Sequence, residues 1–136
     1  MNDFWASAEV ISTYSRKQAI EDGALKDITE AASNRGFPFA AAMTDAAWTE
    51  AVAWDEKNGG LQDEKGRLWD VVSMAWVAAI TSRGRHAAES NRIPFHLYRV
   101  PNVPDATEAN ELELLMEISG GDDGEPVITI MLPHED

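Results

Sequence analysis

The segment with the clearest structural pattern reads Glu111-Leu-Glu-Leu-Leu-Met-Glu-Ile-Ser119. Apolar residues recur in it at every second position, and successive side chains of a strand point to opposite faces. The pattern therefore predicts a strand over residues 110–119. One face would lie on a core (Leu112, Leu114, Met116 and Ile118), and the other would carry glutamates in water (Glu111, Glu113 and Glu117).

Two neighbouring segments predict partner strands for it. Residues 94–100 begin with a proline, which a strand tolerates at its first position. Gly120-Gly-Asp-Asp-Gly124 supplies the glycines that a tight turn needs at positive φ, and an apolar run follows it. We therefore expect a three-stranded antiparallel β-meander over 94–100, 110–119 and 126–132.

The earlier part of the chain has the 3.6-residue period of helices, which we expect over 15–22, 29–35, 44–56 and 67–83. Ser15, Thr29 and Thr44 are placed to cap the first three of them. The helix over 67–83 is apolar nearly all round, so it is expected to be central and buried, after a polar loop over 63–66 and before a capping glycine, Gly84. Four tryptophans at helical spacing are assigned to the core: Trp48, Trp54, Trp69 and Trp76.

Length and composition indicate one domain, residues 1–136, with an α+β fold in which the helices pack on the meander. The chain has 136 residues, of which 44% are hydrophobic and 26% charged, values typical of a globular domain. It has no cysteine, no leader pattern in residues 1–14 and no continuous apolar stretch of about 18 residues. We expect a cytoplasmic protein of a bacterial host, with no membrane partner.

The charge is strongly acidic and unevenly distributed. The net charge is −13, and residues 93–136 hold ten acidic residues against Arg99 alone, a net charge of −9 for that segment. Nucleic acid would be repelled, whereas a basic protein surface would be attracted. Glutamates two residues apart on one strand face are separated by about 7 Å, the spacing of successive phosphates in nucleic acid.

These patterns predict a partner-binding surface and no counter-charge in the neighbouring strands. Its residues would be the carboxylates of the central strand and the following turn: Glu111, Glu113, Glu117, Asp122, Asp123 and Glu125. The alternative is that the strand face is merely solvated and that the acidity serves solubility.

Motifs for catalysis are absent from the sequence. The three histidines are far apart, and no HExxH, GxSxG or glycine-rich phosphate loop occurs. We therefore expect no catalytic residue, no cofactor and no metal. Two alternatives stay open: a transferase-like site around Ser12-Thr-Tyr-Ser15 and Arg16, and an oxygen-ligated cation site in the turn and tail (Asp122, Asp123, Glu125, His134, Glu135 and Asp136).

Five segments carry a resemblance to a known family: Val10-Ile-Ser-Thr-Tyr14, Gly66-Arg-Leu-Trp-Asp70, Met74-Ala-Trp-Val77, Ile93-Pro-Phe-His-Leu-Tyr-Arg-Val-Pro101 and Gly121-Asp-Asp-Gly-Glu-Pro-Val-Ile-Thr-Ile-Met-Leu-Pro-His-Glu-Asp136. The chain resembles an uncharacterised family of small bacterial proteins, many of them on plasmids, phages and other mobile elements. The resemblance implies no catalytic residues. It does imply a mobile-element setting, in which small acidic proteins often act as anti-CRISPR or anti-restriction inhibitors.

The leading hypothesis is thus an acidic inhibitor, resembling anti-CRISPR proteins, that binds a DNA-handling defence complex and blocks its DNA contacts by mimicry. A second hypothesis is a mobile-element accessory protein that binds a peptide or subunit through the edge of its β-sheet. A third is a small transferase-type enzyme. The oligomeric state is left open.

Overall fold

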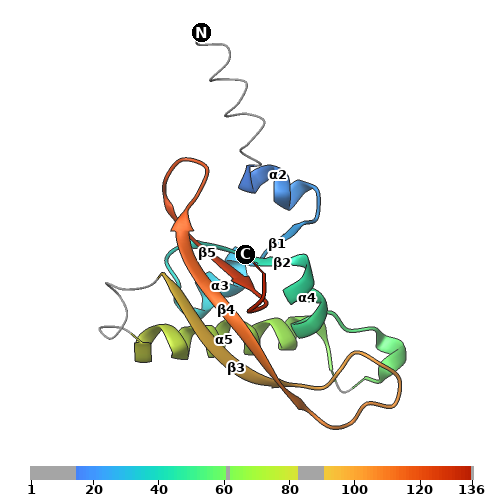
Figure 1. Cartoon of the computed structure of the whole chain (residues 1–136). Helices are drawn as coiled ribbons and strands as arrows, with labels where there is room; N and C mark the ends of the chain where they lie inside the picture. Colours follow the sequence, from blue (N-terminus) through green and yellow to red (C-terminus); the bar gives the residue numbers. More distant parts are fainter. Residues whose placement is uncertain (1–14, 61, 83–90, 136) are drawn as a thin grey trace.

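The computed structural model describes residues 15–60, 62–82 and 91–135, which form one sheet with helices on it (Figure 1). The five strands are β1 (Leu25–Asp27), β2 (Ala40–Thr44), β3 (Arg92–Arg99), β4 (Asn110–Gly120) and β5 (Pro126–Met131). The α-helices are α2 (Arg16–Glu21), α3 (Thr29–Arg35), α4 (Asp45–Ala51) and α5 (Glu64–Ser82), and η1 (Glu56–Asn58) is a 3-10 turn. None of the helices in these ranges is long and apolar enough to cross a membrane.

The α+β fold and the C-terminal meander are confirmed, but the sheet is larger than predicted. Its order is β1-β2-β5-β4-β3, in which β3–β4 and β4–β5 are antiparallel. The expected three strands are extended by β2, which pairs in parallel with β5, and by β1, which pairs antiparallel with β2. The prediction of a three-stranded sheet was therefore wrong, because the N-terminal half adds two strands.

The strand β2 escaped prediction because its composition is atypical. Alanine is depleted in strands, and Ala41, Ala42 and Met43 are all buried, so no alternation marks their two faces. The N–H of Ala41 donates to the hydroxyl of Thr29 at 3.1 Å, and that hydroxyl donates to Asp27 Oδ1 at 2.6 Å. Thr29 thus holds β2 against the start of α3. The prediction that Thr29 caps this helix was wrong, because Ile28 occupies the cap position.

Two helix boundaries differ from the prediction for local reasons. Thr44 does cap α4, accepting from the N–H of Ala47 at 3.1 Å, but the helix ends at Ala51 rather than near residue 56. Asp55 instead caps the separate turn η1 by accepting from the N–H of Lys57 at 2.9 Å. The helix α5 begins at Glu64, before the predicted residue 67, because Asp63 accepts from the N–H of Gly66 at 2.6 Å. The predicted Gly84 cap lies outside the described residues.

The core lies between the sheet and helices α3, α4 and α5. Its largest fully buried apolar side chains come from both layers: Ile28, Met43, Val52, Val71, Val72, Leu114, Met116, Ile128 and Ile130. The prediction that the helix over 67–83 is central and buried was wrong. A helix that packs on one face of a sheet buries only the side that faces the sheet, so the other side of α5 is exposed. Four of its apolar side chains are exposed, including Trp69, which had been assigned to the core: Trp69, Met74, Val77 and Ile80.

The opposite, outer face of the sheet is covered in part by α2. The guanidinium of Arg16 donates to Thr129 Oγ1 at 2.7 Å and to the carbonyl of Ile128 at 2.6 Å, which ties the start of α2 to β5. Figure 1 shows the helix itself next to β1. The outer face of β3 and β4 is exposed to solvent around Tyr98, which is 68% exposed. This two-stranded part of the sheet carries the predicted carboxylates.

Candidate partner-binding surface

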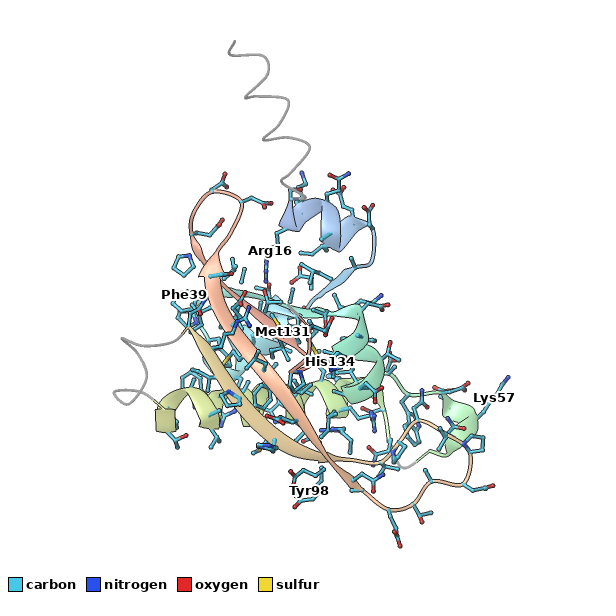
Figure 2. The ribbon with its side chains drawn as sticks, in the orientation of Figure 1. Arg16, Phe39, Lys57, Tyr98, Met131 and His134 are labelled. Carbon is cyan, nitrogen blue, oxygen red and sulfur yellow. The ribbon has the colours of Figure 1, made fainter. Side chains whose placement is uncertain are left out.

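The outer face of β3 and β4 is a mixed strip of acidic, basic and aromatic side chains. The register places His96 opposite Glu113, Tyr98 opposite Glu111 and Arg92 opposite Glu117. Directly opposed residues share a face of the sheet. The three glutamates of β4 therefore lie on one face, while Leu114 and Met116 are buried on the other. Figure 2 shows Tyr98 projecting from this part of the protein.

The expectation that the neighbouring strands lack counter-charge was wrong. Arg92 Nε lies 2.8 Å from Glu117 Oε2, and the side chain of Glu117 is only 20% exposed. His96 Nε2 lies 4.0 Å from Oε1 of both Glu111 and Glu113. Arg92 lies one residue before the acidic segment 93–136, and the strand register brings it opposite Glu117.

We call Glu111 and Glu113 the arm carboxylates. Their side chains are 59% and 50% exposed, respectively. Within the part of the chain that the structure describes, neither has a lysine or arginine within ion-pair distance. A histidine carries a positive charge only when protonated, so neither glutamate is paired with a permanently charged side chain among the described residues.

We call Asp122, Asp123 and Glu125 the turn carboxylates. Asp122 accepts from the backbone N–H groups of Arg16 at 2.8 Å and Lys17 at 3.1 Å, and these hydrogen bonds lower the pKa of its carboxyl. Glu125 Oε1 accepts from the N–H of Asp123 at 3.3 Å within the turn. Both side chains thus have intramolecular roles.

The six predicted residues do not form one continuous patch. Glu113 and Gly120, where the turn begins, are separated by seven residues of extended strand, about 24 Å at about 3.4 Å per residue. Glu117 lies between the two groups but is paired with Arg92. The arm carboxylates are therefore a site of their own, distant from the turn carboxylates.

The cation-site alternative is not favoured by the contacts of the turn and the tail. Asp122 bonds to α2, whereas Glu135 Oε1 accepts from the hydroxyl of Thr44 at 2.7 Å and from the N–H of Leu132 at 2.8 Å. In the described ranges, no group of three histidine, aspartate or glutamate side chains is arranged to hold a metal ion. Asp136 lies outside these ranges.

The transferase alternative depended on Arg16 and the segment before it. The guanidinium of Arg16 is engaged by Thr129 and Ile128, and burial is the main cause that lowers its pKa. Its role in the described structure is to hold α2 on the sheet. Residues 12–14 lie outside the described part of the chain.

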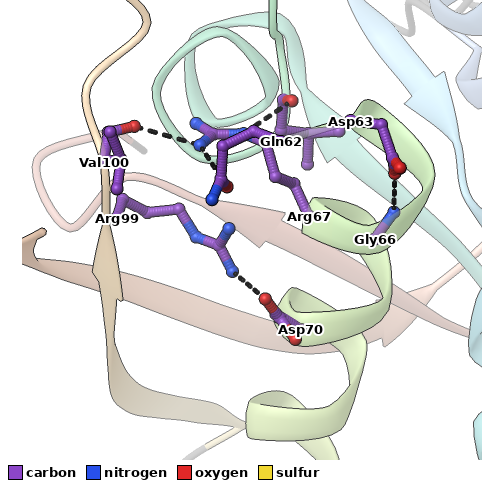
Figure 3. Close-up of polar contacts among 8 residues, drawn as sticks. Gln62, Asp63, Gly66, Arg67, Asp70, Arg99 and Val100 are labelled. Carbon is purple, nitrogen blue, oxygen red and sulfur yellow. Dashed lines mark hydrogen bonds and ion pairs between the residues drawn. The ribbon is translucent and has the colours of Figure 1, made fainter. Parts of the chain in front are cut away.

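Sequence reasoning missed a pair of buried arginines beside the open strands (Figure 3). Arg67 is 1% exposed; its Nε donates to the carbonyl of Val52 and its guanidinium also donates to that of Val100, both at 3.0 Å. Arg99 Nη2 lies 3.1 Å from Asp70 Oδ2. Burial, and next the charge of Arg99, lower the pKa of Arg67. The available signal was that Arg67 lies four residues before Val71, on the buried side of α5.

A groove of about 530 Å³ runs between α5 and β3. Asp70, Ser73 and Met74 line it from the helix. His96, Tyr98 and Glu111 line it from the strands. The groove therefore adjoins the arm carboxylates and combines exposed apolar surface with acidic groups.

The fold and this surface define a small α+β protein with an exposed, acidic sheet arm. The whole chain, residues 1–136, matches the model of a family of unknown function (DUF6573), and the protein belongs to that family. No curated protein and no solved structure matches the chain. The expectation of an uncharacterised family is thus confirmed.

Proposed function

We propose that this protein is an acidic inhibitor, encoded on a mobile element, that binds a basic DNA-contacting surface of a host defence complex, as anti-CRISPR and anti-restriction proteins do. The observation that carries the proposal is the pair of arm carboxylates, Glu111 and Glu113, exposed on the outer sheet face. His96 is the only basic side chain of the described residues within ion-pair distance of them, so they can meet a partner's lysines and arginines.

The contacts of two predicted residues favour a site smaller than the six carboxylates. Glu117 is paired with Arg92, and Asp122 is bonded to the start of α2, so both already have internal partners. Glu111 and Glu113 lie about 7 Å apart by strand geometry, which matches the pitch of phosphates. The remaining negative charge of the protein would accelerate the encounter with a basic surface without contributing to the contact itself.

The proposal is tested first in bacterial hosts that each carry one active CRISPR or restriction system. Expression of the protein should restore phage growth in one of these hosts. The double variant Glu111→Lys/Glu113→Lys should lose this effect, whereas the control Glu30→Lys/Glu50→Lys, with the same change of charge on exposed helix positions, should keep it.

The second test uses the purified defence complex found in that screen. Inhibition of its DNA binding should weaken as salt rises, because exposed charge pairs are screened over about 8–10 Å at physiological ionic strength. Equal inhibition by the arm variant and the unaltered protein, with the same salt dependence, would contradict the proposal.

A second candidate function is the binding of a peptide or subunit through the sheet edge. The observation in its favour is the strand order: among the described strands, β3 is the last of the sheet and pairs with β4 alone. The two functions are compatible, because this edge adjoins the arm carboxylates.

A further inference from the structure

The hydrogen-bond register of β3 shows which of its backbone groups point away from the sheet. The N–H of Ile118 donates to the carbonyl of Asn91 at 2.9 Å, and the β3–β4 register makes these two residues direct opposites. Hydrogen-bonded pairs alternate with non-bonded pairs in an antiparallel ladder. The backbone groups of Ile93, Phe95, Leu97 and Arg99 are therefore used by β4, and those of Arg92, Pro94, His96 and Tyr98 point outward.

Pro94 divides this outward edge into two parts. It occupies an outward position, so its missing N–H costs the β3–β4 ladder no hydrogen bond. It does interrupt the series of outward donors, since a strand added beside it would find no N–H there. His96 and Tyr98 remain as consecutive outward residues that each offer an N–H and a carbonyl.

The space beside His96 and Tyr98 is the groove between β3 and α5, and Met74 is the apolar residue on its helix side, next to Asp70 and Ser73. Met74 is 38% exposed there. Val77, three residues further along α5 and just outside the groove lining, is 41% exposed and neighbours Met74 on the helix surface. A strand added at the usual spacing of about 4.8 Å would place alternate side chains over this apolar surface. Such a strand would bury Met74 and Val77, which would explain why two large apolar side chains are exposed on this helix.

The other face of an added strand would lie beside the arm carboxylates. Asp70, at the helix side of the groove, is already paired with Arg99, so Glu111 and Glu113 carry the uncompensated charge. They favour lysine or arginine on the strand that binds. A second copy of this chain fits poorly, because each copy has a net charge of −13 and would bring its own arm carboxylates to the contact.

We infer that the groove between β3 and α5 binds an extended partner segment in which basic and apolar residues alternate, and that this segment joins the sheet by pairing with His96 and Tyr98. The inference rests on the proposed function and deepens it, because it names the form of the basic partner and how it is held. Backbone pairing supplies the register, Met74 and Val77 bind the apolar residues, and Glu111 and Glu113 bind the basic ones.

The probe for this inference is a labelled peptide of alternating lysine and valine, compared with one that is N-methylated at every second backbone amide. N-methylation prevents strand pairing, keeps the side chains and leaves the protein unaltered. We expect the plain peptide to bind in fluorescence anisotropy and the methylated one to bind at least about tenfold more weakly, since two or more backbone hydrogen bonds are lost. Amide hydrogen exchange at His96 and Tyr98 should slow only with the plain peptide.

Two variants separate the contributions of the groove and of the arm. Met74→Lys should weaken the plain peptide, whereas Lys65→Met, also on α5 but outside this groove, should not. Equal binding of both peptides, or protection of β1 in place of β3, would overturn the inference. The inference would also be overturned if sedimentation showed a concentration-dependent dimer that Tyr98→Pro abolishes, because the groove would then bind a second copy of the chain.

The failure of the inference and that of the proposed function are distinguishable. If Met74→Lys and Tyr98→Pro leave inhibition of the defence complex intact while Glu111→Lys/Glu113→Lys abolishes it, the groove is not the site and the acidic inhibitor proposal stands. If the charge reversal also leaves inhibition intact, the proposed function fails as well.

Discussion

The carboxylate of Asp122 accepts a hydrogen bond from the backbone N–H of Arg16 at 2.8 Å, across 106 residues of sequence. A second bond, from Lys17 at 3.1 Å, joins the same carboxylate to the first turn of α2. The turn between β4 and β5 therefore completes the helix cap begun by Ser15, whose hydroxyl accepts from the N–H of Gln18 at 3.0 Å. An aspartate that the sequence suggested for partner binding thus has a structural role.

Asp122→Asn should make stability less dependent on acid. The two hydrogen bonds lower the pKa of Asp122 in the folded state, so its contribution is fully present above the unfolded pKa of about 3.9 and is lost as the pH falls through the lower, folded pKa. Urea unfolding should show the variant less stable at pH 7 and the difference shrinking below about pH 4. Asp123→Asn, in the same turn, is the control and should behave like the unaltered protein at neutral pH.

Arg67→Met should destabilise the protein by about 2–4 kcal/mol. The substitution keeps a long side chain but leaves the carbonyls of Val52 and Val100 without their donor, and each buried unpaired acceptor costs about 1–3 kcal/mol. Chemical denaturation at neutral pH measures the loss. Lys65→Met, on the exposed side of the same helix, should change stability by less than about 0.5 kcal/mol. A loss of that small size for Arg67→Met would mean that these hydrogen bonds are replaced by water.

Thr44→Ala should cost about 1–2 kcal/mol. The hydroxyl of Thr44 caps α4 through the N–H of Ala47 and also donates to Glu135 Oε1, so one atom joins the helix to the end of the chain. Thermal unfolding compares it with Thr49→Ala, an exposed threonine of α4 that is not at the cap. Amide hydrogen exchange near Leu132 should become faster only in the Thr44 variant. Unchanged exchange there would contradict the role of Thr44 in holding Glu135.

Gly36→Ala should destabilise by about 1–3 kcal/mol. The backbone of Gly36 has a φ of 127°, and a Cβ there would lie 3.1 Å from the ring of Trp76. The same ring packs edge-on against Phe37, with centroids 5.3 Å apart, so it has little room to move away. Gly60→Ala is the control because a Cβ there meets nothing within 4 Å. Equal stability of the two variants in urea would show that the ring yields.

The arrangement of β4 could be predicted from the sequence because its pattern is local. Alternation over residues 111–118 identifies the strand and its buried face, since the period of two is a property of the extended backbone itself. The caps at Ser15 and Thr44 were found for the same reason, because a side chain reaches only the N–H groups two or three residues ahead.

The partners of those elements were decided by the tertiary structure alone. Nothing near Ala40–Thr44 indicates a strand that pairs in parallel with β5, because parallel pairing joins segments that are distant in the chain. The candidate site also depended on the tertiary structure. Arg92 neutralises Glu117, and Asp122 accepts hydrogen bonds from the start of α2. Of the three glutamates of β4, Glu111 and Glu113 are therefore the two without an arginine or lysine partner among the described residues. A sequence shows how many charges a surface carries, but which of them are neutralised depends on the residues that folding places within a few ångströms.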